Sequence, residues 1–160
     1  LCPGAAFGPS KQWPADYFAK IARHYLQQGW QVWLFGSQSD VKTAAYIQTK
    51  TRNRCVDWTG QTSIADAIDL LSVCKQVLAN DSGLMHMAAA VSVPVVGIYG
   101  STKPDFAPPL CPKARIASRP MACRPCKKRS CPLQHTHCLT KLTPRSVLLL
   151  LESQLSEITL

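Results

Sequence analysis

Acidic residues are missing from residues 111–145 of this 160-residue chain, a stretch that holds nine lysines and arginines. Residues 1–110 are nearly balanced, with nine bases and seven acids, so the net charge of +9 comes essentially from that one stretch. A local positive field favours anionic partners such as phosphates, nucleic acid or an acidic membrane surface. Charge alone does not choose among them.

Long hydrophobic runs and late aromatic residues are also missing. The longest apolar stretch, residues 88–98, is interrupted by Ser92 and Pro94 and has about half of the roughly 20 residues that a spanning helix needs. No Phe, Trp or Tyr follows Phe106, so the basic stretch has no stacking platform for single-stranded nucleic acid. With 46% hydrophobic and 17% charged residues, the chain has the composition of one globular domain.

The start of the chain and its cysteines bear on its origin. Because Leu1 stands where a complete chain has Met, and no basic leader or cleavage site precedes it, we expect a piece of a longer protein. Four of the eight cysteines, at positions 123, 126, 131 and 138, crowd into sixteen residues. Since no secretory signal is visible and a core of this size needs no disulfides, we expect reduced thiols in a cytoplasmic protein.

The four clustered thiols leave open whether this segment binds a metal ion. Cys123, Cys126, Cys131 and Cys138, with two histidines between them, have the composition of a structural zinc site. The first pair has the usual spacing, but the second pair is separated by six residues, which is wider than a normal zinc half-site. We therefore assign no metal, while zinc ligation, reduced packing thiols and disulfides stay as alternatives.

Short apolar runs alternate with amphipathic stretches, a pattern typical of an α/β fold. We expect a Rossmann-like parallel sheet with helices on both faces. The helices are predicted over residues 14–28, 40–50, 64–74, 84–90 and 143–155, and the strands over residues 30–35, 54–58, 76–79, 93–99 and 114–117. The chain then divides into a core (1–100), a basic, Cys-rich loop (101–142) and a closing helix (143–158).

In an open parallel sheet, ligands bind at the carboxyl ends of the strands. Residues 80–83 switch from strand to helix at such an end, and the backbone N–H groups of Ser82, Gly83 and Leu84 open the helix. A helix N-terminus with a glycine suits a pyrophosphate. The plainer alternative is that Asp81 and Ser82 only cap the helix.

Two further side chains are candidates for the same ligand. His86 follows Ser82 by four residues and therefore shares its helix face. Lys11 lies in a loop rich in Gly, Pro and Ser, where an ammonium group can neutralise a phosphate. Each has an ordinary alternative, because a helical histidine is more often a packing residue and a loop lysine is more often merely solvated.

Three segments in this order resemble a known family. They are GAAFGPSKQWP at 4–14, NDSGLMH at 80–86 and the pattern C-x2-C-x4-C-P-x2-H-x-H-C-L at 123–139. Together they are similar to the heptosyltransferases of glycosyltransferase family 9, and the cysteine segment favours type II over type I. The resemblance implies the carboxyl-terminal, donor-binding half of a two-domain GT-B glycosyltransferase, with the amino-terminal acceptor domain absent.

The resemblance also implies roles for single residues. Lys11 would contact the donor phosphates and Asp81 the heptose hydroxyls. The other donor-binding positions carried over are Thr62 for the adenine, through its backbone, Ser82 and Gly83 for the phosphate-facing turn, and His86 on the following helix. The base that activates the acceptor belongs to the missing half, so the resemblance places no catalytic residue here and implies that this piece alone is inactive.

The implied reaction is the inverting transfer of heptose from ADP-heptose to the inner core of lipopolysaccharide. It implies no cofactor and no divalent metal, with ADP-heptose and the lipopolysaccharide acceptor as partners. A cytoplasmic location with peripheral contact to the anionic inner membrane would suit the basic segment. Two alternatives stay open: a basic, Cys-rich nucleic-acid-binding module, and another GT-B nucleotide-sugar enzyme such as heptosyltransferase I or an epimerase.

Overall fold

A computed structural model describes residues 1–158 and contains a parallel sheet in two ladders. One ladder pairs β1 (Trp33–Leu34) with β2 (Val56–Asp57), and the other runs β3 (Val77–Asn80), β4 (Val95–Tyr99) and β5 (Arg115–Ser118). The first residues of the chain bridge them, because the Cys2 N–H donates to the Leu78 carbonyl at 2.8 Å and the Phe35 N–H donates to the Leu1 carbonyl at 2.9 Å. Every pairing is parallel, which confirms the predicted fold class.

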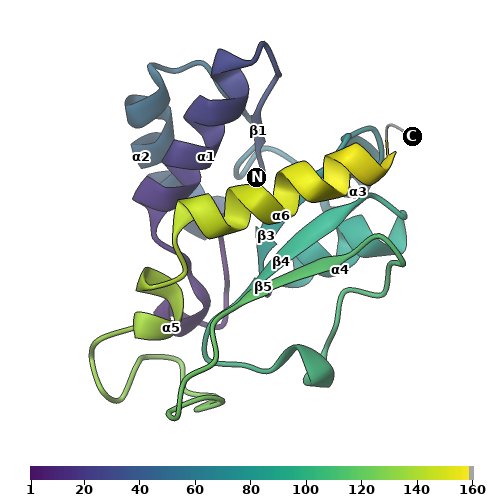
Figure 1. Ribbon diagram of the computed structural model, residues 1–160. Coiled ribbons are helices and arrows are strands. Elements are labelled where there is room, and N and C mark those ends of the chain that lie inside the picture. Colours follow the sequence, from purple (N-terminus) through teal and green to yellow (C-terminus); the bar gives the residue numbers. More distant parts are fainter. Residues whose placement is uncertain (159–160) are drawn as a thin grey trace.

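Helices cover both faces of the sheet (Figure 1). On one face lie α1 (Ala15–Gln27), α2 (Val41–Thr51) and α6 (Pro144–Ile158), and on the other lie α3 (Ile64–Ser72) and α4 (Gly83–Ala90). Alternate side chains of β4 enter the two layers: Val96 and Ile98 pack with the first group, and Val95 and Tyr99 with the second. This explains why β4 is apolar at every position.

Gly97 is the residue of β4 without a side chain, and this makes room for α4. A Cβ at this position would lie 2.6 Å from the Met85 sulfur and 3.2 Å from the Tyr99 ring. The helix therefore packs directly on β4, the central strand of its ladder.

The element boundaries differ from the sequence prediction at several places. The strands predicted over 30–35 and 54–58 shrink to two residues each, because β2 lies at the edge of the sheet and, within residues 1–158, pairs with β1 alone. The structure adds one short helix, α5 (His137–Thr140), and three 3₁₀ turns, η1 (Pro9–Lys11), η2 (Gln38–Asp40) and η3 (Pro104–Phe106). Single turns bury too few apolar side chains to leave a periodic signal.

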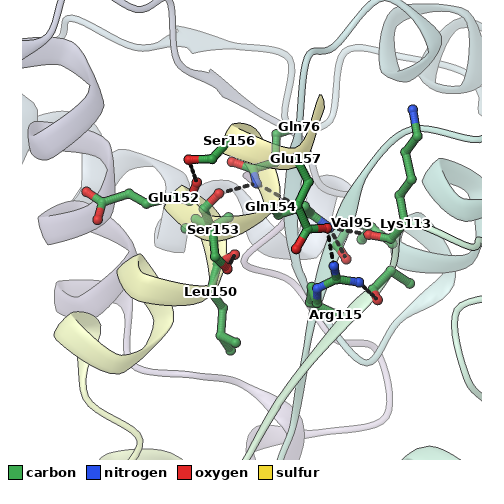
Figure 2. Close-up of polar contacts among 12 residues, drawn as sticks. Gln76, Val95, Lys113, Arg115, Leu150, Glu152, Ser153, Gln154, Ser156 and Glu157 are labelled. Atoms are coloured by element: carbon green, nitrogen blue, oxygen red, sulfur yellow. Dashed lines mark hydrogen bonds and ion pairs between the residues drawn. The ribbon is translucent and has the colours of Figure 1, made fainter. Parts of the chain in front are cut away.

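The closing helix α6 is joined to the sheet by a buried amide, shown in Figure 2. Gln154 is 1% exposed; its Nε2 donates to the Val95 carbonyl at 3.2 Å and also to the Lys113 carbonyl. Its Oε1 accepts from the Gln76 amide at 2.6 Å. These bonds fix α6 across β4 and the residues that lead into β5.

None of the helices in residues 1–158 is long and apolar enough to cross a membrane.

Candidate phosphate-binding site

The candidate site begins at Asn80, the last residue of β3, which is completely buried. Its Nδ2 donates to the Pro3 carbonyl at 2.7 Å, and its Oδ1 accepts from the Trp13 N–H at 3.1 Å. Asn80 therefore holds both ends of the loop that carries Lys11. Trp13 is itself buried against Tyr17 and Phe18, so it is a packing residue at the entry of α1.

The two hydrogen bonds of Asn80 bring Lys11 close to Asp81, the residue that follows Asn80. The Lys11 Nζ lies 2.6 Å from Asp81 Oδ2, and the two side chains are only 15% and 6% exposed. The same carboxylate oxygen accepts a hydrogen bond of 2.6 Å from the Thr102 hydroxyl. Thr102 was not singled out from the sequence, although it follows β4 just as Asp81 follows the neighbouring strand β3.

The start of α4 is open. Within residues 1–158, the N–H groups of Ser82, Gly83 and Leu84 have no backbone acceptor, and the Ser82 Oγ is buried without a partner. A Cβ added at Gly83 would meet only the end of Met87, at 4.0 Å. The capping alternative is wrong for this helix, since Ser82 makes no side-chain cap and Asp81 bonds to Thr102 and Lys11 instead.

The other two candidates, His86 and Thr62, take no part in the contact between Lys11 and Asp81. His86 is half-buried on α4, and its imidazole makes no hydrogen bond within the described residues. Thr62 lies in the turn between β2 and α3, where Ser63 caps α3 by accepting from the Asp66 N–H at 3.2 Å. Their roles toward a ligand stay predictions.

The basic segment packs against the Lys11 loop. The Ser10 N–H donates to the Arg129 carbonyl at 3.1 Å, and the Lys127 N–H donates to the Ser101 carbonyl at 3.0 Å. Arg124 donates to the Thr102 carbonyl at 2.7 Å. Gly8 permits this approach, because it has φ +142° and a Cβ there would lie 2.7 Å from the Arg129 carbonyl oxygen. The basic segment therefore forms one side of the candidate site.

The clustered cysteines lie in the same segment and line a cavity together with Ser10 and Ser101. All eight cysteines are free, and the four clustered ones line one cavity of about 20 Å³. Burial raises the pKa of Cys138, whereas a hydrogen bond with the Thr136 backbone lowers the pKa of Cys131. No group of three or more His, Cys, Asp or Glu in residues 1–158 is arranged to hold a metal ion. The zinc alternative therefore has no ligand set in the described part of the chain.

Comparison with known proteins decides the family. The profile described as glycosyltransferase family 9 (heptosyltransferase) matches residues 1–137. The chain belongs to glycosyltransferase family 9. Lipopolysaccharide heptosyltransferase 2 of Salmonella typhimurium is 39% identical over 98% of this family 9 chain, which spans only 46% of that protein.

Solved structures agree with this family 9 assignment. E. coli ADP-heptose lipopolysaccharide heptosyltransferase II superposes with a TM-score of 0.87 at 35% identity, over 99% of this chain and 46% of that one. TibC from enterotoxigenic E. coli, described as an iron-containing heptosyltransferase in complex with ADP-D-beta-D-heptose, has a TM-score of 0.73 at 17% identity, over 96% of this chain and 43% of that one. The second similarity shows the fold alone.

Proposed function

We propose that this chain binds ADP-heptose as the donor in the transfer of heptose to the inner core of lipopolysaccharide, as part of a type II heptosyltransferase. Family membership and the names of its relatives support this reaction. The observation that carries the proposal is the Lys11–Asp81 pair beside the open start of α4. Because the chain spans less than half of these relatives, we assign the acceptor contacts and the base to the remainder of the enzyme.

The donor diphosphate is proposed to take the hydrogen bonds that the start of α4 leaves unused. The free N–H groups of Ser82, Gly83 and Leu84 can donate hydrogen bonds to an anion, and the positive end of the helix dipole strengthens this attraction. Lys11 would leave Asp81 for a phosphate oxygen and stabilise the charge that develops on the departing ADP.

Asp81 then becomes available for the sugar. A carboxylate accepts hydrogen bonds from sugar hydroxyls, and the bond from Thr102 holds Asp81 in place while Lys11 changes partner. Without the donor, Lys11 and Asp81 neutralise each other's charge. When the donor binds, each of the two side chains would contact the donor instead. In this proposal, one residue serves the diphosphate and the other serves the heptose.

A titration of ADP and ADP-heptose into the chain tests the proposal. We expect Lys11→Ala to weaken ADP binding by about 1–3 kcal/mol, because a charge-assisted contact is lost. Asp81→Asn should weaken ADP-heptose binding more than ADP binding. Lys42→Ala is the control, since Lys42 is an exposed lysine on α2 away from this contact.

Stability must be measured beside affinity, because Lys11→Ala leaves the buried Asp81 carboxylate without its cation. The double variant Lys11→Ala/Asp81→Asn removes that penalty and should still bind ADP weakly. Equal ADP affinity in the original chain and the folded double variant would refute the assignment.

A further inference from the structure

We propose that Arg129 is a second cationic binding residue for the donor diphosphate, an inference that rests on the proposed function. The reason is a charge deficit. In the structure the charge of Lys11 is already matched by Asp81 at 2.6 Å, so the pair contributes no net positive charge. The diphosphate of a nucleotide sugar carries about two negative charges, whereas the other donors of the site, the N–H groups of α4, are uncharged, so a further cation would complement the ligand.

Arg129 and Lys11 contact the same aromatic ring, that of Phe7. The Lys11 Nζ lies 5.0 Å from the centre of the Phe7 ring, and the Arg129 Cζ lies 5.8 Å from the same centre. Phe7 thus contacts both cations within the range of cation–π attraction. The Arg129 Nη2 also donates to the Ala6 carbonyl at 3.3 Å, which keeps the guanidinium of this exposed residue at the loop that carries Lys11.

The backbone of Arg129 is fixed to the same loop. Its carbonyl accepts from the Ser10 N–H at 3.1 Å, and the Ser10 hydroxyl bonds to Ser101 at 3.0 Å and to the Lys128 carbonyl. Ser10, directly before Lys11, is therefore joined to residues 128–129 and to Ser101, which follows β4. The guanidinium is pre-positioned without forming an ion pair with an acid in residues 1–158.

The neighbouring base Lys127 contacts a different aromatic ring. Lys127 places its Nζ 3.7 Å from the centre of the exposed Phe106 ring, away from Phe7. Of three consecutive bases, Arg129 is thus the one that contacts the ring also contacted by Lys11. A guanidinium suits this position, because its planar fork bonds to two phosphate oxygens at once.

The test is ADP binding by Arg129→Met, which keeps the unbranched apolar stem, and by Arg129→Lys, which keeps the charge. We expect Arg129→Met to weaken ADP binding about tenfold and to leave the weaker binding of adenosine unchanged. Arg129→Lys should recover part of the loss. The control Lys127→Met removes one charge from the same segment and should change ADP affinity less than twofold.

Three outcomes would overturn the inference. One is an unchanged ADP affinity in Arg129→Met while the Lys11 variants bind weakly, which leaves the proposed function standing. Another is an equal loss in Lys127→Met, which would reduce the effect to the general positive field. The third is an equal loss for adenosine, which would indicate a disturbed loop. If the Lys11 variants also bind ADP normally, the proposed site itself fails.

Discussion

At the scale of single residues, the polar side chains of this domain mostly fix the start of an element or the end of a loop. Ser63 and Asp66 form a capping box at α3: the Ser63 hydroxyl accepts from the Asp66 N–H, and the Asp66 carboxylate accepts from the Ser63 N–H at 3.0 Å and from its hydroxyl at 2.7 Å. The bond from the Ser63 side chain, followed by that from its backbone, lowers the pKa of Asp66.

We expect Ser63→Ala to destabilise the domain by about 1 kcal/mol at neutral pH, because a cap is lost. A carboxyl group whose pKa is lowered by folding stabilises the fold above its unfolded pKa, and this contribution is lost as the pH falls through the folded value. The difference between the two chains should therefore narrow in acid, and the pKa of Asp66 should rise in the variant. Urea unfolding at several pH values and an NMR titration measure both effects.

Ser72→Ala is the matched control at the other end of α3, where the Ser72 hydroxyl only donates to the Asp69 carbonyl. It should change stability by less than about 0.5 kcal/mol, as exposed substitutions usually do. A Ser63→Ala chain whose stability deficit is the same at acid and neutral pH would contradict the role given to Asp66.

At the scale of elements, α6 is positioned by one buried amide as well as by its apolar face. Gln154 points from α6 toward β4 and β5 among the contacts of Figure 2, where Arg115 and Glu157 also form an ion pair. Val147 and Leu151 bury the apolar side of the same helix. Apolar burial stabilises the contact, while the directional amide bonds select the register of α6 on the sheet.

We expect Gln154→Met to destabilise the chain by about 1–3 kcal/mol, although the side chains are similar in size. The reason is that the Val95 and Lys113 carbonyls and the Gln76 amide lose a buried partner. Equilibrium unfolding in urea measures the loss, and Ser153→Ala, at the exposed neighbour, serves as the control. A change below about 0.5 kcal/mol would show that apolar packing alone positions α6.

At the scale of the whole molecule, the basic segment is bonded to the loop that carries Lys11. Residues 101, 127 and 129 bond to each other or to Ser10, which joins the stretch of bases at 127–129 to the loop that carries Lys11. Lys113 and Arg115 lie instead at the start of β5, beside α6. An anionic ligand beside Lys11 would therefore stabilise the loop, the segment and the core together.

We expect ADP at a hundred times its Kd to stabilise the chain by about 2.7 kcal/mol, since it binds only the folded state. For a domain of this size, this corresponds to a rise in Tm of roughly 5–10 °C. Thermal unfolding monitored by circular dichroism measures the shift. A generic DNA duplex at the same phosphate concentration should produce none, and the reverse result would favour the nucleic-acid-binding alternative.

The sequence alone determined the order and type of the main elements. Helical and strand periodicity depends on which positions are apolar, so α1, α3, α4 and β4 were predicted close to their observed positions. The family was also accessible, because Lys11, Asp81 and the clustered cysteines stand in recognisable local patterns, and the comparison confirmed it. Short elements such as α5 were missed for lack of a period.

Only the tertiary structure decided which of the candidate residues meet. The contact of Lys11 with Asp81, the bond from Thr102 and the position of Arg129 at Phe7 all join residues far apart in the chain. Local patterns carry no information on such contacts, because they depend on how parallel strands place their following loops at one edge. The sequence therefore determined which chemical groups are present, and the packing of the sheet determined that they lie in contact.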